Sequence, residues 1–251
     1  MNPRGRWQGM LTILRFNWPF YLTAGVVLIA AMAAVASPIP TLWKLLGAGA
    51  AVGAGYFLFV SLGVSHWVYD RSDLSRFHWL NRALEGARRD RVLFCHSGFD
   101  DLSAMLRARL QPDHWLALDH FDPEQMTEAS IRRARRICPL SAGTVSAPFD
   151  QWPVESSSVD LVFGLLAIHE FRPETERTRW FAQARRCLRP GGRVILAEHL
   201  RDPANFLAFG PGFLHFHSAA SWRRCWEGAG FRTADEFRIT PWIRVFVLLP
   251  P

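Results

Sequence analysis

The stretch RVLFCHSGFDDL, residues 91–102, has the pattern of a buried strand, a tight turn and the start of a helix. This pattern is typical of the first strand and the ligand-binding loop of a nucleotide-binding α/β domain. The loop contains a single glycine, Gly98, and two aspartates follow it, Asp100 and Asp101. Both the fold and the ligand of the chain depend on how this loop is interpreted.

Apolar strand-like segments and amphipathic helix-like segments alternate from this loop to the C-terminus. We expect helices over residues 101–110, 123–137, 174–188 and 218–230, and strands over residues 91–95, 114–119, 143–149, 159–168, 193–200, 231–239 and 242–249. The alternation predicts an α/β fold with a Rossmann-like, mainly parallel seven-stranded sheet covered by helices on both faces. The last two strands are close in sequence and should form an antiparallel C-terminal hairpin. Ligands of such sheets bind at the carboxyl ends of the strands.

Two uncharged segments, residues 16–36 and 45–64, precede this domain. Each is about as long as the roughly 20 residues that a membrane-spanning helix needs. We therefore expect an anchor with two transmembrane helices in residues 1–65, with Gly49 and Gly53 allowing close helix packing. The stretch AVASPIP also resembles a signal-peptide cleavage site, but the second segment would still return the chain to the cytoplasm.

Basic residues indicate the topology. The chain has a net charge of +7. Arginines lie before the first apolar segment and after the second, whereas only Lys44 is near the turn between them. The positive-inside rule places both termini and the following domain on the cytoplasmic side of an inner (cytoplasmic) membrane. We expect residues 66–90 to form an amphipathic interfacial linker or lid helix. Anionic lipid explains the arginines near the membrane, so no nucleic-acid partner is expected.

Neither a redox motif nor a metal site is expected. The four cysteines are far apart and form no CxxC pair. Histidine and acid spacings along the chain match no strong set of metal ligands. The sequence contains no pattern that defines an oligomeric state.

Residues 69–251 resemble the class I S-adenosylmethionine-dependent methyltransferases. The segments that carry the resemblance are VLFCHSGFDD, LALDHFDPEQMTEASIRRAR, FDQWPVESSSVDLVFGLLAIHEF, CLRPGGRVILAEH and EGAGF, in the order of the family. The segment YDRSDLSRFHWL is similar to the N-terminal part of the quinone-methylating branch. The resemblance implies a methyltransferase-like domain over residues 91–251 and S-adenosyl-L-methionine as the cofactor.

The same resemblance implies which residues hold the cofactor. An acid at the end of the second strand, Asp119, would bind the ribose hydroxyls, and Phe149 with Asp150 would hold the adenine. The family has an acid at position 94 and glycines at positions 96, 98 and 100, of which this chain keeps only Gly98. The implied cofactor-binding set is Tyr69, His96, Ser97, Gly98, Asp100, Asp119, His120, Phe149, Asp150 and Leu165.

The charge of the loop favours this cofactor over a dinucleotide. A helix that binds pyrophosphate needs open N–H groups and positive potential, and two aspartates there would repel phosphate. S-adenosylmethionine has no phosphate and carries a sulfonium and an ammonium group. A nicotinamide-dependent oxidoreductase is therefore disfavoured. Asp100 would bind the ammonium group, cap the following helix, or do both.

The acceptor side has candidates at the ends of the fourth and fifth strands. An oxygen or carbon acceptor loses a proton during methylation, so a base with a pKa near neutrality is useful. We expect catalytic roles for His169, Glu198 and His199, and the loop with His215 and His217 could close over the site. These features predict a membrane-anchored methyltransferase with a hydrophobic or lipid-like acceptor. The alternative is a non-catalytic methyltransferase-like protein that serves as a membrane binding module or scaffold.

Replacing Asp100 with alanine separates its two possible roles. If Asp100 binds the ammonium group, the variant should lose affinity for S-adenosylmethionine much more than it loses folding stability. Calorimetric titration and thermal unfolding of the same preparation measure the two effects. Equal losses would mean that Asp100 only caps the helix.

Overall fold

The computed structural model describes residues 5–138 and 140–251, and the chain forms two compact units. The first unit contains Met1–Ser72 and Pro203–Gly212, and the second contains Asp73–Asp202 and Phe213–Pro251. The chain therefore leaves the first unit at residue 72 and contributes to it again at residue 203.

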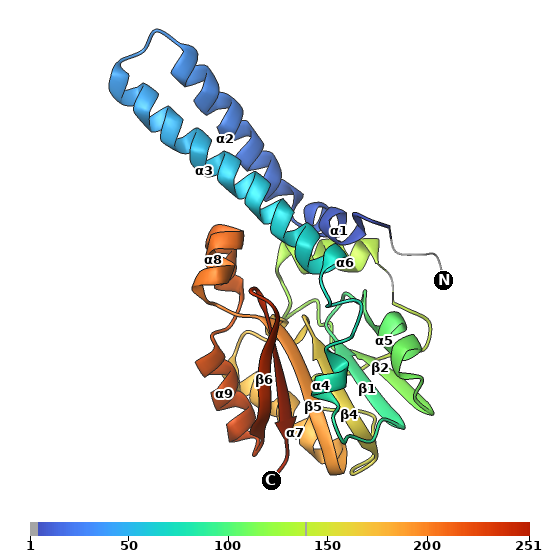
Figure 1. The fold of residues 1–251 in the computed structure, drawn as a ribbon. Coiled ribbons are helices and arrows are strands. Elements are labelled where there is room, and N and C mark those ends of the chain that lie inside the picture. The colour runs from blue at the N-terminus through green and yellow to red at the C-terminus, as the bar shows by residue number, and fades with distance from the viewer. Residues whose placement is uncertain (1–4, 139) are drawn as a thin grey trace. The chain divides into compact units, whose positions relative to one another are not determined.

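The first unit is helical. Its elements are α1 (Gln8–Phe16), α2 (Trp18–Ala36), α3 (Thr41–His66), the π-helical turn η1 (Trp67–Arg71) and α8 (Pro203–Phe209). Helices α2 and α3 lie side by side as a hairpin (Figure 1). The predicted helix pair is thus present.

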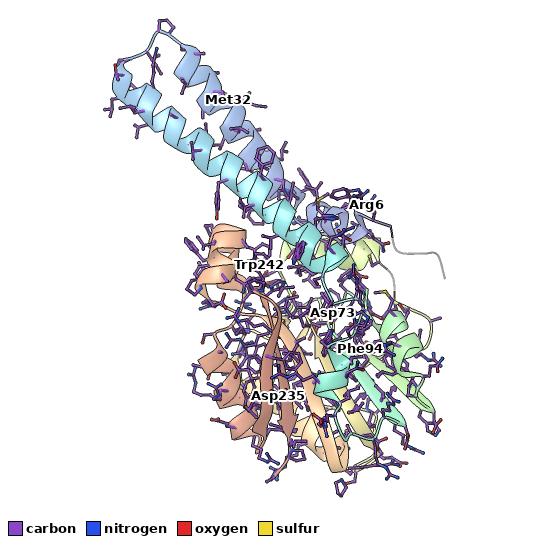
Figure 2. The ribbon with its side chains drawn as sticks, in the orientation of Figure 1. Arg6, Met32, Asp73, Phe94, Asp235 and Trp242 are labelled. Carbon is purple, nitrogen blue, oxygen red and sulfur yellow. The ribbon has the colours of Figure 1, made fainter. Side chains whose placement is uncertain are left out.

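Apolar side chains cover the outside of the hairpin. The exposed fraction is 52% for Met32 on α2 and 79% for Phe59 on α3, whereas Phe94 in the core of the second unit is 1% exposed (Figure 2). Little of either helix is buried. The buried share is 11% for the most apolar stretch of α2 and 6% for that of Thr41–Arg71, which is α3 continued by η1. Both helices are long and apolar enough to cross a membrane.

The two helices approach each other at a glycine other than the predicted ones. A Cβ atom added to Gly47 would lie 3.2 Å from the carbonyl oxygen of Ala31, whereas nothing lies within 4 Å of one added to Gly49 or Gly53. The predicted contact of Gly49 and Gly53 is therefore wrong, because these glycines face away from α2. Nearer the other end of the hairpin, the Tyr21 hydroxyl lies 3.0 Å from the Ser61 hydroxyl.

Residues 66–90 do not form the single amphipathic helix that we expected. They contain η1, a set of turns and the short helix α4 (Leu80–Ala83). The Asp73 carboxylate accepts hydrogen bonds from the backbone N–H groups of His78 and Trp79, at 3.2 and 2.8 Å. Phe77, which directly precedes His78, has a φ of +62°. Both features stabilise a turn where a continuous helix would have to run.

The second unit is a seven-stranded sheet in the order β3-β2-β1-β4-β5-β7-β6. Strands β1 to β5 are parallel, and β7 is antiparallel to both β5 and β6. The predicted fold is confirmed, including the C-terminal hairpin. The strands are β1 (Arg91–His96), β2 (His114–Asp119), β3 (Thr144–Ser146), β4 (Val159–Leu165), β5 (Leu188–His199), β6 (Arg232–Thr240) and β7 (Ile243–Leu249).

Helices surround the sheet (Figure 1). They are α5 (Ser103–Leu110), α6 (Ala129–Ile137), α7 (Glu174–Cys187) and α9 (Ala219–Gly228), with the 3₁₀ turns η2 (Ile168–Glu170) and η3 (Gly210–His215). Helix α6 begins six residues later than predicted, because Asp122 accepts a hydrogen bond from the Glu124 N–H and holds the preceding segment in a turn. Aromatic packing joins α7 and α9, with Phe181 in edge-to-face contact with Trp222 and Trp226.

A buried arginine ties the loop after β4 to α7 and α9. Arg177 is 1% exposed. Its Nη1 donates to the carbonyl oxygens of Phe171 and Arg172 at 2.6 and 2.7 Å, and its Nη2 donates to the Ser221 hydroxyl at 2.9 Å. A buried guanidinium is tolerated only where its hydrogen bonds are made. Arg177 therefore fixes the loop that contains η2.

We expect Arg177→Met to lower the free energy of unfolding of the second unit by about 3 kcal/mol, because buried carbonyl groups lose their donor. Urea unfolding of the detergent-solubilised chain, followed by tryptophan fluorescence, measures the change. The matched control is Arg179→Met on the same helix, since the Arg179 side chain is 68% exposed. Equal stability of the two variants would contradict the role of Arg177.

Candidate functional site

The carboxyl ends of four strands bring most of the predicted residues to one edge of the sheet. His96 at the end of β1 is in register with Asp119 at the end of β2. Leu165 at the end of β4 is in register with Ala197 of β5, which Glu198 follows. Parallel strands end at a common edge, and this edge is where such sheets bind ligands.

The loop after β1 requires its remaining glycine. Gly98 has a φ of +84°, in the left-handed region that glycine adopts without strain. A Cβ atom there would also lie 2.7 Å from the Phe121 ring. The Gly98 N–H donates to Asp119 Oδ1 at 2.8 Å. The loop thus keeps a glycine at a position where any side chain would be both strained and obstructed.

Asp119 is buried and already has several partners. Its Oδ1 accepts hydrogen bonds from the N–H groups of Gly98 and Phe121, at 2.8 and 3.1 Å. Its Oδ2 lies 2.8 Å from Nη1 of Arg135, whose guanidinium also lies over the Phe121 ring. Each carboxylate oxygen accepts about two hydrogen bonds. Oδ2 itself makes no hydrogen bond, so it can accept from ribose hydroxyls, but the Arg135 guanidinium lies beside it in an ion pair and would share this oxygen or move aside.

Buried polar atoms beside Asp119 fit an uncharged polar ligand. Among the described residues, both ring nitrogens of His96, the Ser97 hydroxyl and Nε2 of His120 are buried without a hydrogen bond. Burial lowers the pKa of His96, and it lowers the pKa of His120 to about 4, so both rings are neutral near pH 7. Unpaired buried groups of this kind are costly. The hydroxyls and ring nitrogens of an adenosyl group would satisfy them without charge repulsion from the histidines.

Asp100 caps the helix that follows the loop. Its Oδ1 accepts hydrogen bonds from the N–H groups of Leu102 and Ser103 at 3.2 and 2.9 Å, and its Oδ2 accepts one from the Ser103 hydroxyl. The capping role is thus present. Binding of the cofactor ammonium group by Asp100 remains a prediction.

The remaining predicted cofactor residues lie in different surroundings. Phe149 packs against Phe171, with ring centroids 5.1 Å apart. Asp150 lies 3.6 Å from the exposed Arg179. Leu165 is buried at the end of β4. Tyr69 lies in η1, which belongs to the first unit, so its contact with the cofactor stays a prediction.

The sequence did not lead us to Trp152, an aromatic residue beside the predicted cofactor-binding residue His120. The His120 ring stacks on Trp152 with centroids 5.5 Å apart and packs against Phe171 at 6.0 Å. Nδ1 of His120 donates to the carbonyl oxygen of Ala147 at 2.9 Å. Trp152 lies two residues beyond Asp150, so the signal was present in the segment FDQWP.

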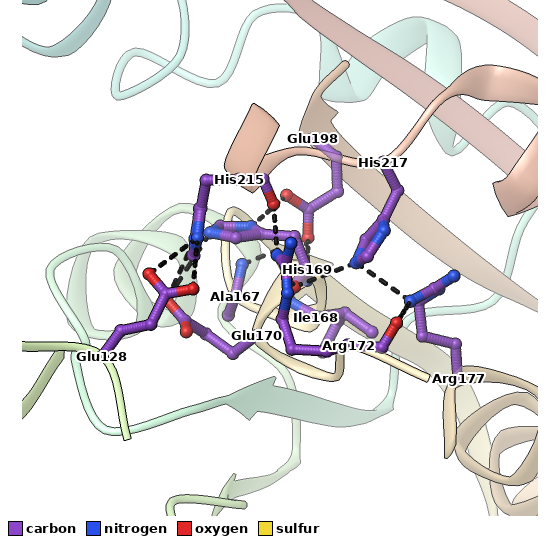
Figure 3. A network of polar contacts seen from close by, with 10 residues as sticks. All are labelled: Glu128, Ala167, Ile168, His169, Glu170, Arg172, Arg177, Glu198, His215 and His217. Atoms are coloured by element: carbon purple, nitrogen blue, oxygen red, sulfur yellow. Dashed lines mark hydrogen bonds and ion pairs between the residues drawn. The ribbon is translucent and has the colours of Figure 1, made fainter. Parts of the chain in front are cut away.

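On the acceptor side, a buried carboxylate holds His169 (Figure 3). Glu198 Oε1 accepts hydrogen bonds from the N–H groups of Ala167, Ile168 and His169, at 2.9 to 3.3 Å. Its Oε2 lies 2.7 Å from His169 Nδ1. This contact places the proton of the neutral ring on Nδ1 and leaves Nε2 with a lone pair. His169 is therefore the candidate base, and Glu198 positions it.

The other histidines of this region have separate roles. His199 Nδ1 lies 3.0 Å from the Trp242 carbonyl oxygen, and its ring stacks on Phe216. His217 Nε2 accepts a hydrogen bond from Arg177 at 2.9 Å, and burial with this cation lowers the pKa of His217 to about 3. These contacts hold both rings in place, and the predicted catalytic role of His199 stays a prediction.

His215 faces the same carboxylate as His169. His215 Nε2 lies 3.6 Å from Glu170 Oε1, and His169 Nε2 lies 3.7 Å from that oxygen. Burial lowers the pKa of His215, but hydrogen bonds to Glu128 and Glu170 outweigh it and raise the pKa to about 9. His215 is thus charged at pH 7, although the Arg172 guanidinium donates a hydrogen bond to its backbone carbonyl oxygen.

Comparisons with known proteins agree with the fold of the second unit. Residues 104–196 match a family model described as a methyltransferase domain. The PH0226 protein of Pyrococcus horikoshii OT3 superimposes with a TM-score of 0.52 and 15% identity over 71% of this chain and 89% of that one. An S-adenosylmethionine-dependent methyltransferase from Clostridium acetobutylicum ATCC 824 has a TM-score of 0.52 and 9% identity over 71% and 92%. At such identities the likeness is one of fold. No curated protein matches the chain.

Arg135 competes with the cofactor for Asp119. We therefore expect Arg135→Met to bind S-adenosylmethionine about five-fold more tightly, which corresponds to roughly 1 kcal/mol. Isothermal titration calorimetry measures the affinity, and Arg136→Met, which removes an exposed neighbour on the same helix, is the control. Weaker binding by Arg135→Met alone would mean that Arg135 contacts the cofactor itself.

Proposed function

We propose that the chain is a membrane-anchored, S-adenosylmethionine-dependent enzyme that methylates a hydrophobic, lipid-like acceptor, because residues 104–196 match a methyltransferase-domain model and the sheet has the fold of a methyltransferase that uses this cofactor. The observation that carries the proposal is the exposed apolar surface of α2 and α3 in the same chain as this domain. A soluble acceptor would reach the domain without such an anchor.

The anchor is compatible with a bilayer in length and in charge. Helix α2 has 19 residues, and about 1.5 Å per residue gives about 28 Å, close to the hydrocarbon thickness of about 30 Å. Arg15 lies in the last turn of α1 just before α2, and Arg71 ends η1 just after α3. Positive charge at these ends of both helices supports a cytoplasmic location of the termini and of the domain at the cytoplasmic membrane.

The residues present define what each half of the site does. The bound cofactor would supply an activated methyl group. Gly98, Asp119, His96 and His120 would hold its adenosyl part through the contacts and unpaired atoms described above. His169 Nε2 would accept the proton of an oxygen or carbon acceptor, with the Nδ1 proton held by Glu198. Quinone-like phenols and lipid hydroxyls have this chemistry.

One observation favours the non-catalytic alternative. Arg135 forms an ion pair with Asp119 Oδ2, the oxygen that ribose hydroxyls would use, and the loop after β1 has a single glycine. A protein in which Arg135 never moves would keep the fold and the anchor without binding the cofactor.

Methyl transfer to a membrane lipid fraction tests the proposal. The full-length chain in proteoliposomes is incubated with methyl-labelled S-adenosylmethionine and an organic extract of membrane lipids. We expect label in the lipid phase, and we expect His169→Ala to lower the transfer rate at least about hundredfold while cofactor affinity stays unchanged. His114→Ala is the control, because His114 is exposed at the start of β2.

Two outcomes would contradict the proposal. No cofactor binding by a well-folded chain would support the scaffold alternative. Release of the chain from membranes by alkaline carbonate would mean that α2 and α3 do not span the bilayer. The argument for a lipid-like acceptor would then be lost.

A further inference from the structure

We propose that His169, Glu170 and His215 form a binding site for a divalent transition-metal ion of the Zn²⁺ type. The three residues come from η2 and from the end of η3, and they gather at the acceptor side of the domain (Figure 3). Their ligand atoms all lie within 4.8 Å of one another.

The spacing of these atoms suits a metal ion. Glu170 Oε1 lies 3.7 Å from His169 Nε2 and 3.6 Å from His215 Nε2. Metal bonds of about 2.0 to 2.1 Å in tetrahedral geometry place neighbouring ligand atoms about 3.4 Å apart. The two imidazole rings are nearly perpendicular, at 83°. Small side-chain movements would therefore close the three atoms around an ion.

The outer hydrogen bonds orient both histidines for this purpose. His169 Nδ1 lies 2.7 Å from the Glu198 carboxylate, and His215 Nδ1 lies 2.9 Å from that of Glu128. Carboxylates that accept the Nδ1 proton are the usual second layer of metal-binding histidines, because they fix the tautomer and raise the basicity of Nε2. Both Nε2 atoms of this cluster are thus turned toward Glu170.

The net charge of the cluster also favours a bound cation. Glu128, Glu170 and Glu198 bring three negative charges to two imidazoles. The Arg172 guanidinium donates to the carbonyl oxygens of His169 and His215 and contributes one positive charge. When the ion takes the place of the His215 proton, both imidazoles are neutral and two negative charges remain, which a divalent ion would neutralise.

Sequence spacing could not reveal this site. His215 lies 45 positions after Glu170, so the set has none of the short intervals that identify metal motifs. The expectation that the chain binds no metal was based on those intervals alone. The fold supplies the proximity instead, because η2 and the end of η3 meet beside the carboxyl end of β4.

A bound ion would narrow the acceptor class, and this step rests on the proposed methyl transfer. Three protein ligands leave a position open for an oxygen of the acceptor. An ion there would make a bound hydroxyl more acidic, so that its proton passes to water. The oxygen would then bond to the methyl carbon as the carbon–sulfur bond of the sulfonium breaks and the neutral thioether leaves. His169 is then a ligand, since the metal bond uses the Nε2 lone pair. The acceptor would be an oxygen nucleophile.

Metal binding by the full-length, detergent-solubilised chain tests the site without any activity measurement. After chelator treatment and removal of any affinity tag, titration calorimetry with Zn²⁺ should give one ion per chain. His215→Ala and Glu170→Gln should weaken binding at least about hundredfold, and Glu128→Gln about ten- to hundredfold. Co²⁺ should give visible bands of a four-coordinate site that His215→Ala abolishes.

His114→Ala is the control, since it removes one exposed histidine and should leave the affinity unchanged. Thermal unfolding and S-adenosylmethionine titration establish that each variant is folded. Absence of stoichiometric binding, or equal affinity of all variants, would overturn the assignment and leave an ion-pair network. A chain that binds the ion but transfers no methyl group would contradict the proposed function and not the metal site.

Discussion

The buried carboxylate of Glu198 is the constraint on which the acceptor side of the domain depends. A buried charge is stable only when its hydrogen bonds are complete, and here three consecutive backbone N–H groups and the His169 ring surround it. The turn after β4 must therefore wrap around the end of β5. Leu166 is held in that turn at a φ of +55°, and its N–H donates to Ala197 at 2.8 Å. Such backbone strain persists where neighbouring contacts fix the chain on both sides.

The two halves of the edge differ in their electrostatics. Around Asp119, burial keeps His96 and His120 neutral, which suits the uncharged adenosyl part of the cofactor. Around Glu170, carboxylates outnumber the other charges and favour a cation. One edge of the sheet thus presents two groups of residues that favour ligands of different charge. One group lies at the ends of β1 and β2, and the other lies beyond the ends of β4 and β5.

The fold and the sheet edge with the predicted cofactor-binding residues could be predicted from the sequence, because both follow from local patterns. Apolar runs define the strands, and parallel strands bring Gly98 and Asp119 together whatever the exact conformation of the loop. The sequence was insufficient where long side chains from distant segments meet. Arg135 on Asp119 and His215 beside Glu170 depend on side-chain directions that no spacing encodes. The contact at Gly47 instead of Gly49 has the same origin, since helix rotation decides which small residue faces the partner.

The return of residues 203–212 to the first unit has a practical consequence for protein production. The Tyr56 hydroxyl of α3 donates to the Leu207 carbonyl oxygen of α8 at 2.9 Å, and Phe206 and Leu207 remain largely exposed. Cutting the chain after Ser72 would leave α8 without this partner and with its apolar side chains in water. A crystallisable fragment would therefore need two edits, removal of the first 72 residues and replacement of the α8 segment by a short polar linker.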